Sequence, residues 1–105
     1  MKKIEQEYAA QSADFFSDPI PVELFNSFSA QINATNGNSL DANVALQVCN
    51  DESTWVDVTG TVKALAGSED TQVYDIVQSA VAYVRIRFEI IGGDADFDID
   101  WVLKD

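Results

Sequence analysis

The sequence predicts an all-β protein, an antiparallel β-sandwich of seven to eight short strands with jelly-roll or Greek-key wiring. Two observations carry this prediction. Apolar and polar residues alternate in short runs, and turn-forming residues separate nearly all of these runs, at a spacing of roughly ten residues. The chain has 105 residues, enough for one domain with one hydrophobic core.

The clearest alternating run is YVRIRFEIIGGDADFDIDWVLKD, residues 83–105, in which two stretches flank Gly92-Gly93. A two-residue Gly-Gly loop between such stretches predicts a β-hairpin. The register that this loop sets collects apolar side chains on one face: Val84, Ile86, Phe88, Ile90, Ala95, Phe97, Ile99 and Trp101. The opposite face would contain two cation–carboxylate pairs. These pairs are Arg85–Asp100 and Arg87–Asp98.

The remaining elements follow from local patterns in chain order. Residues 1–13 are polar, and we expect an N-terminal arm that becomes ordered on a partner, ahead of a sandwich domain at 14–105. Both prolines lie in residues 14–22, which places this segment at a sheet edge or in a loop. Further strands are expected at 23–34, 42–49, 54–58, 61–66 and 71–77. Turns are expected at 35–39, 50–53 and 67–70, where Asn, Gly, Asp and Ser gather.

The chain has 18 acidic and 6 basic residues, for a net charge of −12. Such a surface repels phosphate backbones and anionic membranes, so we expect no nucleic-acid partner. No apolar run approaches the roughly 20 residues that a membrane-spanning helix needs. Met1-Lys2-Lys3 is followed by Glu5 and Glu7 and not by an apolar stretch, so we expect a protein kept in the cytoplasm unless it leaves within a particle. The charge serves either solubility and resistance to non-specific association, or life in a saline habitat or contact with a basic partner.

The residue types argue against an enzyme and against a cofactor. Histidine is absent, which removes the commonest general base and excludes a Ser-His-Asp triad. Cys49 is the only cysteine, so neither an internal disulfide nor a cysteine-based zinc site can form. We expect Cys49 to be a small buried or edge-strand residue and not a reactive thiol.

The acidic ladder from Asp94 to Asp100 resembles a calcium loop in its spacing, but alternate side chains of a strand cannot converge on one ion. In the predicted hairpin, Glu89 lies opposite Asp96, with Asp94 next in line. These three acids are therefore the candidates for a metal ion or a basic partner, although we expect no metal site.

The aromatic residues offer two further candidate surfaces. Trp101 shares the apolar hairpin face, whereas Trp55 is either a core residue or an exposed platform on which a sugar could stack. Tyr8, Phe15, Phe16 and Ile20 either cap the sandwich or contact a neighbouring subunit.

The run VALQVCNDESTWVDVTG, followed later by YVRIRF, resembles a recurrent sandwich unit in which a V-x-L-Q-x-S-N-D strand leads to W-x-D and then to a Y-V-R-x-x-F/Y strand. The matching residues are Val44, Leu46, Gln47, Asn50, Asp51, Trp55, Asp57, Tyr83, Val84, Arg85 and Phe88. The layout is similar to that of small structural proteins of bacteriophage particles, and more loosely to discoidin-type and carbohydrate-binding sandwiches.

This resemblance implies a non-enzymatic virion component made in a bacterial host cytoplasm. The first hypothesis is a capsid-decorating, vertex-associated or tail-associated protein whose partners are other virion proteins and copies of itself in a homo-oligomer. We expect residues 1–22 to provide the contact. The alternatives are a carbohydrate-binding module and an acidic adaptor or inhibitor that binds a basic protein surface.

Overall fold

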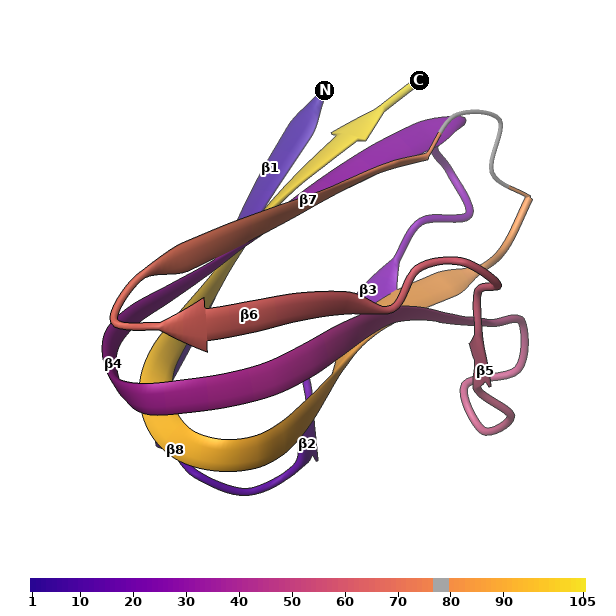
Figure 1. The fold of residues 1–105 in the computed structure, drawn as a ribbon. Helices are drawn as coiled ribbons and strands as arrows, with labels where there is room; N and C mark the ends of the chain where they lie inside the picture. The colour runs from indigo at the N-terminus through magenta and orange to yellow at the C-terminus, as the bar shows by residue number, and fades with distance from the viewer. Residues whose placement is uncertain (77–79) are drawn as a thin grey trace.

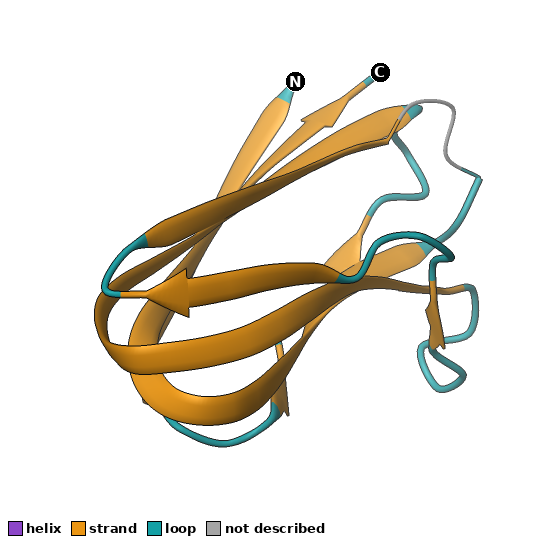
Figure 2. Ribbon diagram, in the orientation of Figure 1, coloured by secondary structure: helices purple, strands orange, loops and turns teal. Residues whose placement is uncertain are grey.

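The computed structural model describes residues 1–76 and 80–105. In these residues the chain is all β, as predicted, and Figure 2 shows strands joined by loops and turns. The strands are β1 (Lys2–Gln11), β2 (Phe15–Phe16), β3 (Ile20–Pro21), β4 (Ser27–Cys49), β5 (Val56–Asp57), β6 (Lys63–Gly67), β7 (Asp70–Ile76) and β8 (Tyr83–Lys104). All pair in antiparallel fashion.

Two long strands form the frame of the molecule. β4 and β8 pair with each other from Ser27 and Lys104 at one end to Cys49 and Tyr83 at the other. Both strands bend midway, and the bend folds the sheet over on itself into two layers (Figure 1). The sandwich is therefore one continuous sheet whose two central strands run through both layers.

Each layer adds edge strands to one half of the β4–β8 pair. In the first layer, β1 pairs with the second half of β8, and β7 pairs with the first half of β4. In the second layer, β2 and β3 pair with the first half of β8, while β5 and β6 pair with the second half of β4. The chain termini lie close together because Lys2 pairs with Leu103 (Figure 1).

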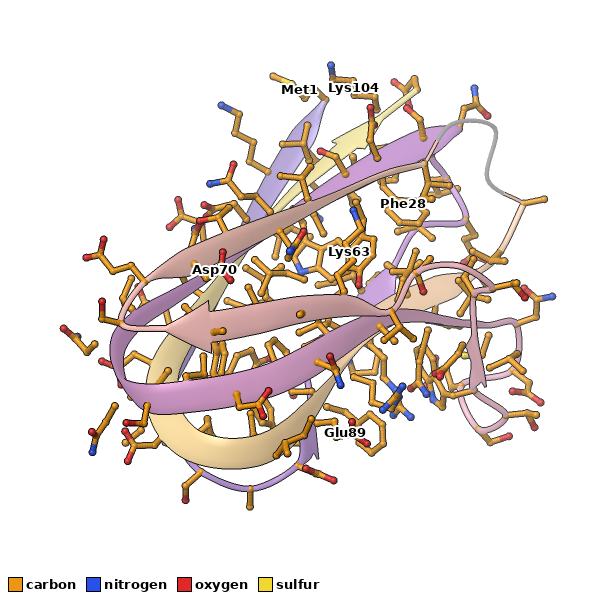
Figure 3. All side chains as sticks on the ribbon, in the orientation of Figure 1. Met1, Phe28, Lys63, Asp70, Glu89 and Lys104 are labelled. Carbon is orange, nitrogen blue, oxygen red and sulfur yellow. The ribbon has the colours of Figure 1, made fainter. Side chains whose placement is uncertain are left out.

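The core lies between the two layers, and side chains fill this space (Figure 3). Phe88 of the second layer meets Phe97 of the first with ring centroids 4.9 Å apart, and Phe28 packs near Trp101. The indole of Trp101 is fully buried, and its Nε1 donates a hydrogen bond to Gln6 Oε1 at 2.8 Å. The predicted apolar face of residues 83–105 is confirmed, since all of its members belong to the core or pack against it.

The predicted hairpin is wrong, although its alternation is right. Gly92-Gly93 does not close a loop, because β8 continues through both glycines and each half pairs with β4. A bent strand and a hairpin satisfy the same alternation, and only the identity of the neighbouring strand separates them. The Arg85–Asp100 and Arg87–Asp98 pairs are wrong for the same reason, since the members of each lie in different layers of the sandwich.

The Asn-Gly segment at 35–39 likewise bends a strand where a turn between two strands was expected. β4 passes through it with shifts of register against β8, and Asn36 and Ser39 have φ values of 52° and 54°. Residues with left-handed backbone conformation interrupt flat pairing and increase local bending. The turn signals at residues 50–53 and 67–70 do separate strands, as predicted.

Two other expectations need correction. Residues 1–13 were expected to be an arm, but residues 2–11 form β1, which pairs with β8 and covers Trp101 through Gln6. Leu24 was expected within the strand at 23–34, yet it precedes β4 in a turn and is 84% exposed. The strand expected at 71–77 corresponds to β7, and Val77 lies outside the described residues.

Candidate functional site

The outer face of the first layer is acidic. β1 and β8 place five carboxylates on it, from Glu5, Glu7, Asp96, Asp98 and Asp100. The register sets Glu5 directly opposite Asp100 and Glu7 directly opposite Asp98. Like charges directly opposite one another on neighbouring strands destabilise a sheet. The sequence did not reveal these two pairs because it gave no sign that residues 2–11 form a strand.

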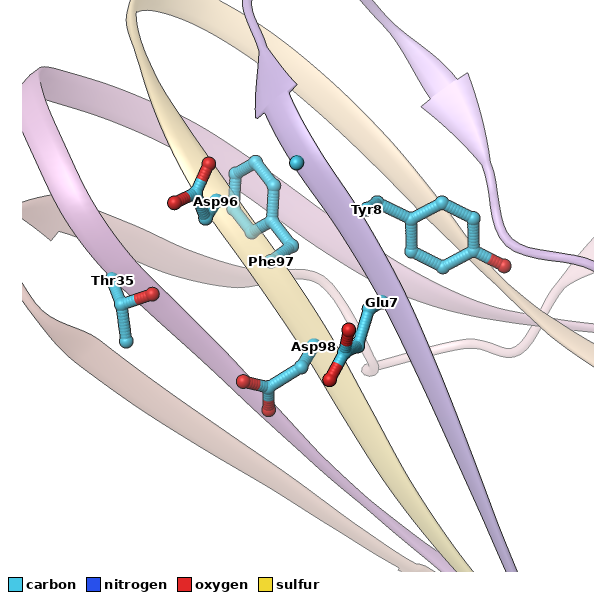
Figure 4. A pocket seen from close by; sticks show the side chains of 7 residues that line it. Glu7, Tyr8, Thr35, Asp96, Phe97 and Asp98 are labelled. Carbon is cyan, nitrogen blue, oxygen red and sulfur yellow. The ribbon is translucent and has the colours of Figure 1, made fainter.

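A shallow hollow of about 230 Å³ lies on this face where β1 departs from regular pairing. The carboxylates of Glu7 and Asp98 lie side by side at its rim, with Thr35 and Asp96 across from them (Figure 4). Asp98 Oδ1 accepts a hydrogen bond from Asn33 Nδ2 at 2.7 Å.

At this hollow, Asp96 stabilises the irregular part of β1. Its carboxylate accepts hydrogen bonds from Asn36 Nδ2 at 2.9 Å and from the backbone N–H of Ala10 at 2.7 Å. These two donors, Asn36 foremost, hold the pKa of Asp96 below its usual range. Ala10 has a φ of 53° within the irregular part of β1, so Asp96 stabilises the bulge.

The three acids predicted to cluster at the Gly92-Gly93 end are separated by the fold. Glu89 faces Asn43 and accepts its Nδ2 hydrogen bond at 3.2 Å, whereas Asp94 pairs with Asn38 and Asp96 with Thr35. The prediction that Glu89 lies opposite Asp96 is therefore wrong. Across residues 1–76 and 80–105, no three acidic or cysteine side chains are grouped so that they could hold a metal ion.

The outer face of the second layer carries an arginine cluster, made of Phe16, Gln47, Trp55, Asp57, Arg85 and Arg87. The strands bring these residues together because Gln47 of β4 pairs with both Arg85 of β8 and Asp57 of β5. Phe16 of β2 pairs with Arg87. Trp55 stands just before β5, at the end of the loop that follows β4.

The polar members of the arginine cluster form a chain of hydrogen bonds. Arg85 Nε donates to Gln47 Oε1 at 2.8 Å, and Gln47 Nε2 donates to Asp57 Oδ1 at 2.8 Å. Arg87 completes the chain with an ion pair to Asp57, whose Nη2–Oδ2 distance is 3.0 Å. The hydrogen bonds from Arg87 and then Gln47 hold the pKa of the Asp57 carboxyl below its usual range.

Aromatic rings flank the guanidinium of Arg85. Its Cζ lies 3.9 Å from the centre of the Phe16 ring and 4.2 Å from the centre of the Trp55 ring. These are cation–π contacts, which are stronger where the cation is removed from water. Burial lowers the pKa of Arg85, in keeping with this loss of hydration. Trp55 is half-buried and belongs neither to the core nor to the side chains packed against it, so of its two alternatives the structure excludes the position in the core between the layers.

The four residues predicted as an interface occupy different environments. Ile20 is 5% exposed and belongs to the core, and Phe15 stacks on Phe88 with ring centroids 4.3 Å apart. Tyr8 packs against Phe15, and its hydroxyl accepts a hydrogen bond from the Asp18 N–H at 2.8 Å. Phe16 is 50% exposed. Three of the four therefore cap the chain's own sandwich, and Phe16 is the one with a large exposed surface.

A second apolar surface lies near the chain termini. Leu24 is 84% exposed and lines a hollow of about 180 Å³ together with Lys2, Pro21, Glu23 and Phe25, and Met1, the chain neighbour of Lys2, is 74% exposed. Isolated exposed apolar side chains are ordinary, but a group of them beside a hollow is typical of contact surfaces. The sequence signal for this surface was Leu24-Phe25, soon after the two prolines, but these two residues were assigned to the strand expected at 23–34.

Comparisons with known proteins relate this chain to others by fold alone. No family model matches the sequence, and no curated protein matches it either. Among solved structures, the SPBc2 prophage-derived protein YomS is similar with a TM-score of 0.56 and 11% identity, over 98% of this chain and 95% of that one.

Two other solved structures share the architecture. A Bacillus endospore appendage protein, described as forming disulfide-linked pili, matches with a TM-score of 0.53 and 8% identity, over 99% of this chain and 87% of that one. A protein described as CBM4 matches with a TM-score of 0.53 and 14% identity, over 87% of this chain and 59% of that one. These likenesses show the sandwich fold. The described residues also contain no helix long and apolar enough to cross a membrane.

Proposed function

We propose that this chain is a non-enzymatic structural subunit of a bacteriophage particle that acts by protein–protein assembly. The observation that carries the proposal is the likeness in fold to YomS, because it extends over nearly the whole of both chains and YomS is prophage-derived. The likeness to the endospore appendage protein supports a role in assembly, since that chain also forms a multi-subunit structure.

The surface near the termini supports assembly on physical grounds. Leu24 is 84% exposed and presents apolar area at a hollow of about 180 Å³ that Pro21 and Phe25 also line. Burial of such area contributes about 25 cal/mol per Å². We propose that this surface contacts neighbouring subunits in the particle, either copies of this chain or another virion protein.

The test combines solution size with location. Light scattering after size exclusion would give the oligomeric state of the wild type and of a Leu24→Asp variant, with Val73→Asp as the control at another exposed apolar position. We expect Leu24→Asp to reduce self-association or incorporation into particles at least tenfold and Val73→Asp to leave both unchanged. Antibody labelling of purified phage particles would locate the chain. The proposal fails if particles lack the chain.

One observation favours a second candidate, a carbohydrate-binding module. The half-buried Trp55 and the 50% exposed Phe16 lie on a sheet face that also carries the polar side chains of Gln47, Asp57 and Arg87, and aromatic rings beside hydrogen-bonding groups suit a sugar ring. The likeness to the CBM4 structure points the same way. A glycan array probed with the wild type and Trp55→Ala tests it, since specific binding must be lost in the variant.

A further inference from the structure

Arg85 is a partly buried cation with no carboxylate partner among residues 1–76 and 80–105, in a chain that contains 18 acidic residues. Its one hydrogen bond within the described residues is to the neutral amide oxygen of Gln47. No carboxylate of the described residues lies within ion-pair distance of it. A guanidinium has five N–H donors, so four remain on the two Nη atoms.

Arg87 lies on the same surface as Arg85 but, unlike Arg85, it is paired with a carboxylate. It stands two residues further along β8, points to the same face and is held by both carboxylate oxygens of Asp57. Gln47 separates Asp57 from Arg85 by accepting from the arginine and donating to the carboxylate. The network thus assigns the available carboxylate to Arg87 and fixes Arg85 through Nε alone.

The rings of Phe16 and Trp55 then restrict how a ligand can reach Arg85. The centres of both rings lie within 4.2 Å of the Arg85 Cζ and occupy space above its plane, which leaves the in-plane Nη edge as the place where a carboxylate can accept two parallel hydrogen bonds. The fixed Nε also removes much of the side-chain entropy that binding would otherwise cost. The site is therefore organised before any ligand arrives.

We propose that the Nη edge of Arg85 binds a carboxylate side chain of a partner protein, carried next to an apolar side chain that packs on the exposed ring of Phe16. A protein carboxylate fits better than a polyanion, because a protein with a net charge of −12 repels a polymer of phosphate or acidic sugar along its whole length. A single carboxylate carries one charge, and the nearby Arg85 attracts it. The inference rests on the proposed function only for the partner's identity as a particle subunit.

The test is an NMR titration of the full chain with acetyl-Leu-Glu-Leu-amide, observed through the Arg85 side-chain N–H signals and the Trp55 indole N–H. Acetyl-Leu-Gln-Leu-amide is the neutral control, and glucuronate supplies the same carboxylate on a sugar. We expect the Glu peptide to shift these signals and to bind at least about tenfold more tightly than the Gln peptide, which is a difference of about 1.4 kcal/mol. Equal binding by the two peptides overturns the proposal, and tighter binding by glucuronate overturns the protein partner.

Variants add a second readout. Arg85→Lys keeps the charge but loses the planar fork, and we expect at least a fivefold weaker affinity for the Glu peptide. Lys104→Gln removes an exposed cation outside the arginine cluster and should leave the affinity unchanged. Equal losses in the two variants would mean non-specific charge attraction and would overturn the site. If Arg85→Lys does not fold, the two peptides on the wild type decide.

The site and the proposed function can fail separately. Glu-peptide binding through Arg85 by a chain that is absent from phage particles would refute the function and leave the carboxylate site standing. A chain found in particles whose Arg85 and Trp55 signals ignore the Glu peptide would refute the site and leave the function standing.

Discussion

Gly93 packs against the backbone of Asn38 at the point where both long strands bend. A Cβ atom on Gly93 would overlap the carbonyl oxygens of Asn38 and Ser39, and Gly93 has a φ of 71°. Only glycine meets both conditions at no steric cost. This contact allows β4 and β8 to stay paired while the sheet folds over.

The first prediction concerns this bend. We expect Gly93→Ala to lower the free energy of unfolding by about 2 kcal/mol or more, because it adds backbone strain and a clash. Gly92→Ala is the matched control, since a Cβ there meets nothing within 4 Å and its φ is not positive. Urea denaturation measures both. Similar small losses in the two variants would contradict the assigned role of Gly93.

The second prediction concerns β1 as a part of the fold. Gln6→Ala removes the acceptor for the fully buried Trp101 indole N–H, and an unsatisfied buried donor costs about 1–3 kcal/mol. We therefore expect a loss of stability in this range by urea denaturation. Gln31→Ala, at an exposed position, should change stability little. If Gln6→Ala is equally silent, β1 does not cover Trp101 in solution.

The third prediction follows from the ion pair between Asp57 and Arg87. The folded-state pKa of Asp57 is depressed, so the carboxylate contributes stability above its unfolded pKa of about 3.9 and loses it as the pH falls through the folded value. The two side chains are 41% and 27% exposed, which limits the contribution to about 0.2–1 kcal/mol.

Asp57→Asn should therefore be less stable than the wild type at pH 7, and the difference should shrink below about pH 4. Urea denaturation at pH 7 and pH 2.5 measures this difference. Asp75→Asn is the control for a carboxylate outside any ion pair in the described residues. A difference that grows towards low pH would have the opposite sign and would exclude the pair as its cause.

The fourth prediction concerns the like-charge pairs across β1 and β8. Glu5→Lys converts the Glu5–Asp100 pair into an opposite-charge pair, and we expect a gain of about 0.2–1 kcal/mol. Glu69→Lys, in the turn between β6 and β7, changes the net charge equally without a cross-strand partner. Thermal unfolding of both variants separates local pairing from general charge reduction. Equal gains would assign the effect to net charge alone.

The candidate sites were only partly predictable. Trp55 was recognised as an aromatic residue that could stand at the surface. Its contact with Arg85 was not predicted, because the register of the predicted hairpin paired Arg85 with Asp100. The arginine cluster draws on four strands and one loop, from Phe16 to Arg87. No short-range sequence pattern predicts that residues so far apart in the chain come into contact.

The sequence by itself determined the fold class and which side chains of residues 83–105 face inward. Alternation with period two is a local property, so Phe88, Phe97 and Trp101 were assigned to the core without knowing their partners. The tertiary structure decided which strands pair. Gly92-Gly93 is compatible with a closed turn or with a bend, and residues 2–11 with an arm or with an edge strand. The outcome depends on the free energy gained when β4 and β1 bury apolar area against β8. That free energy comes from contacts between residues far apart in the sequence, so no local pattern contains it.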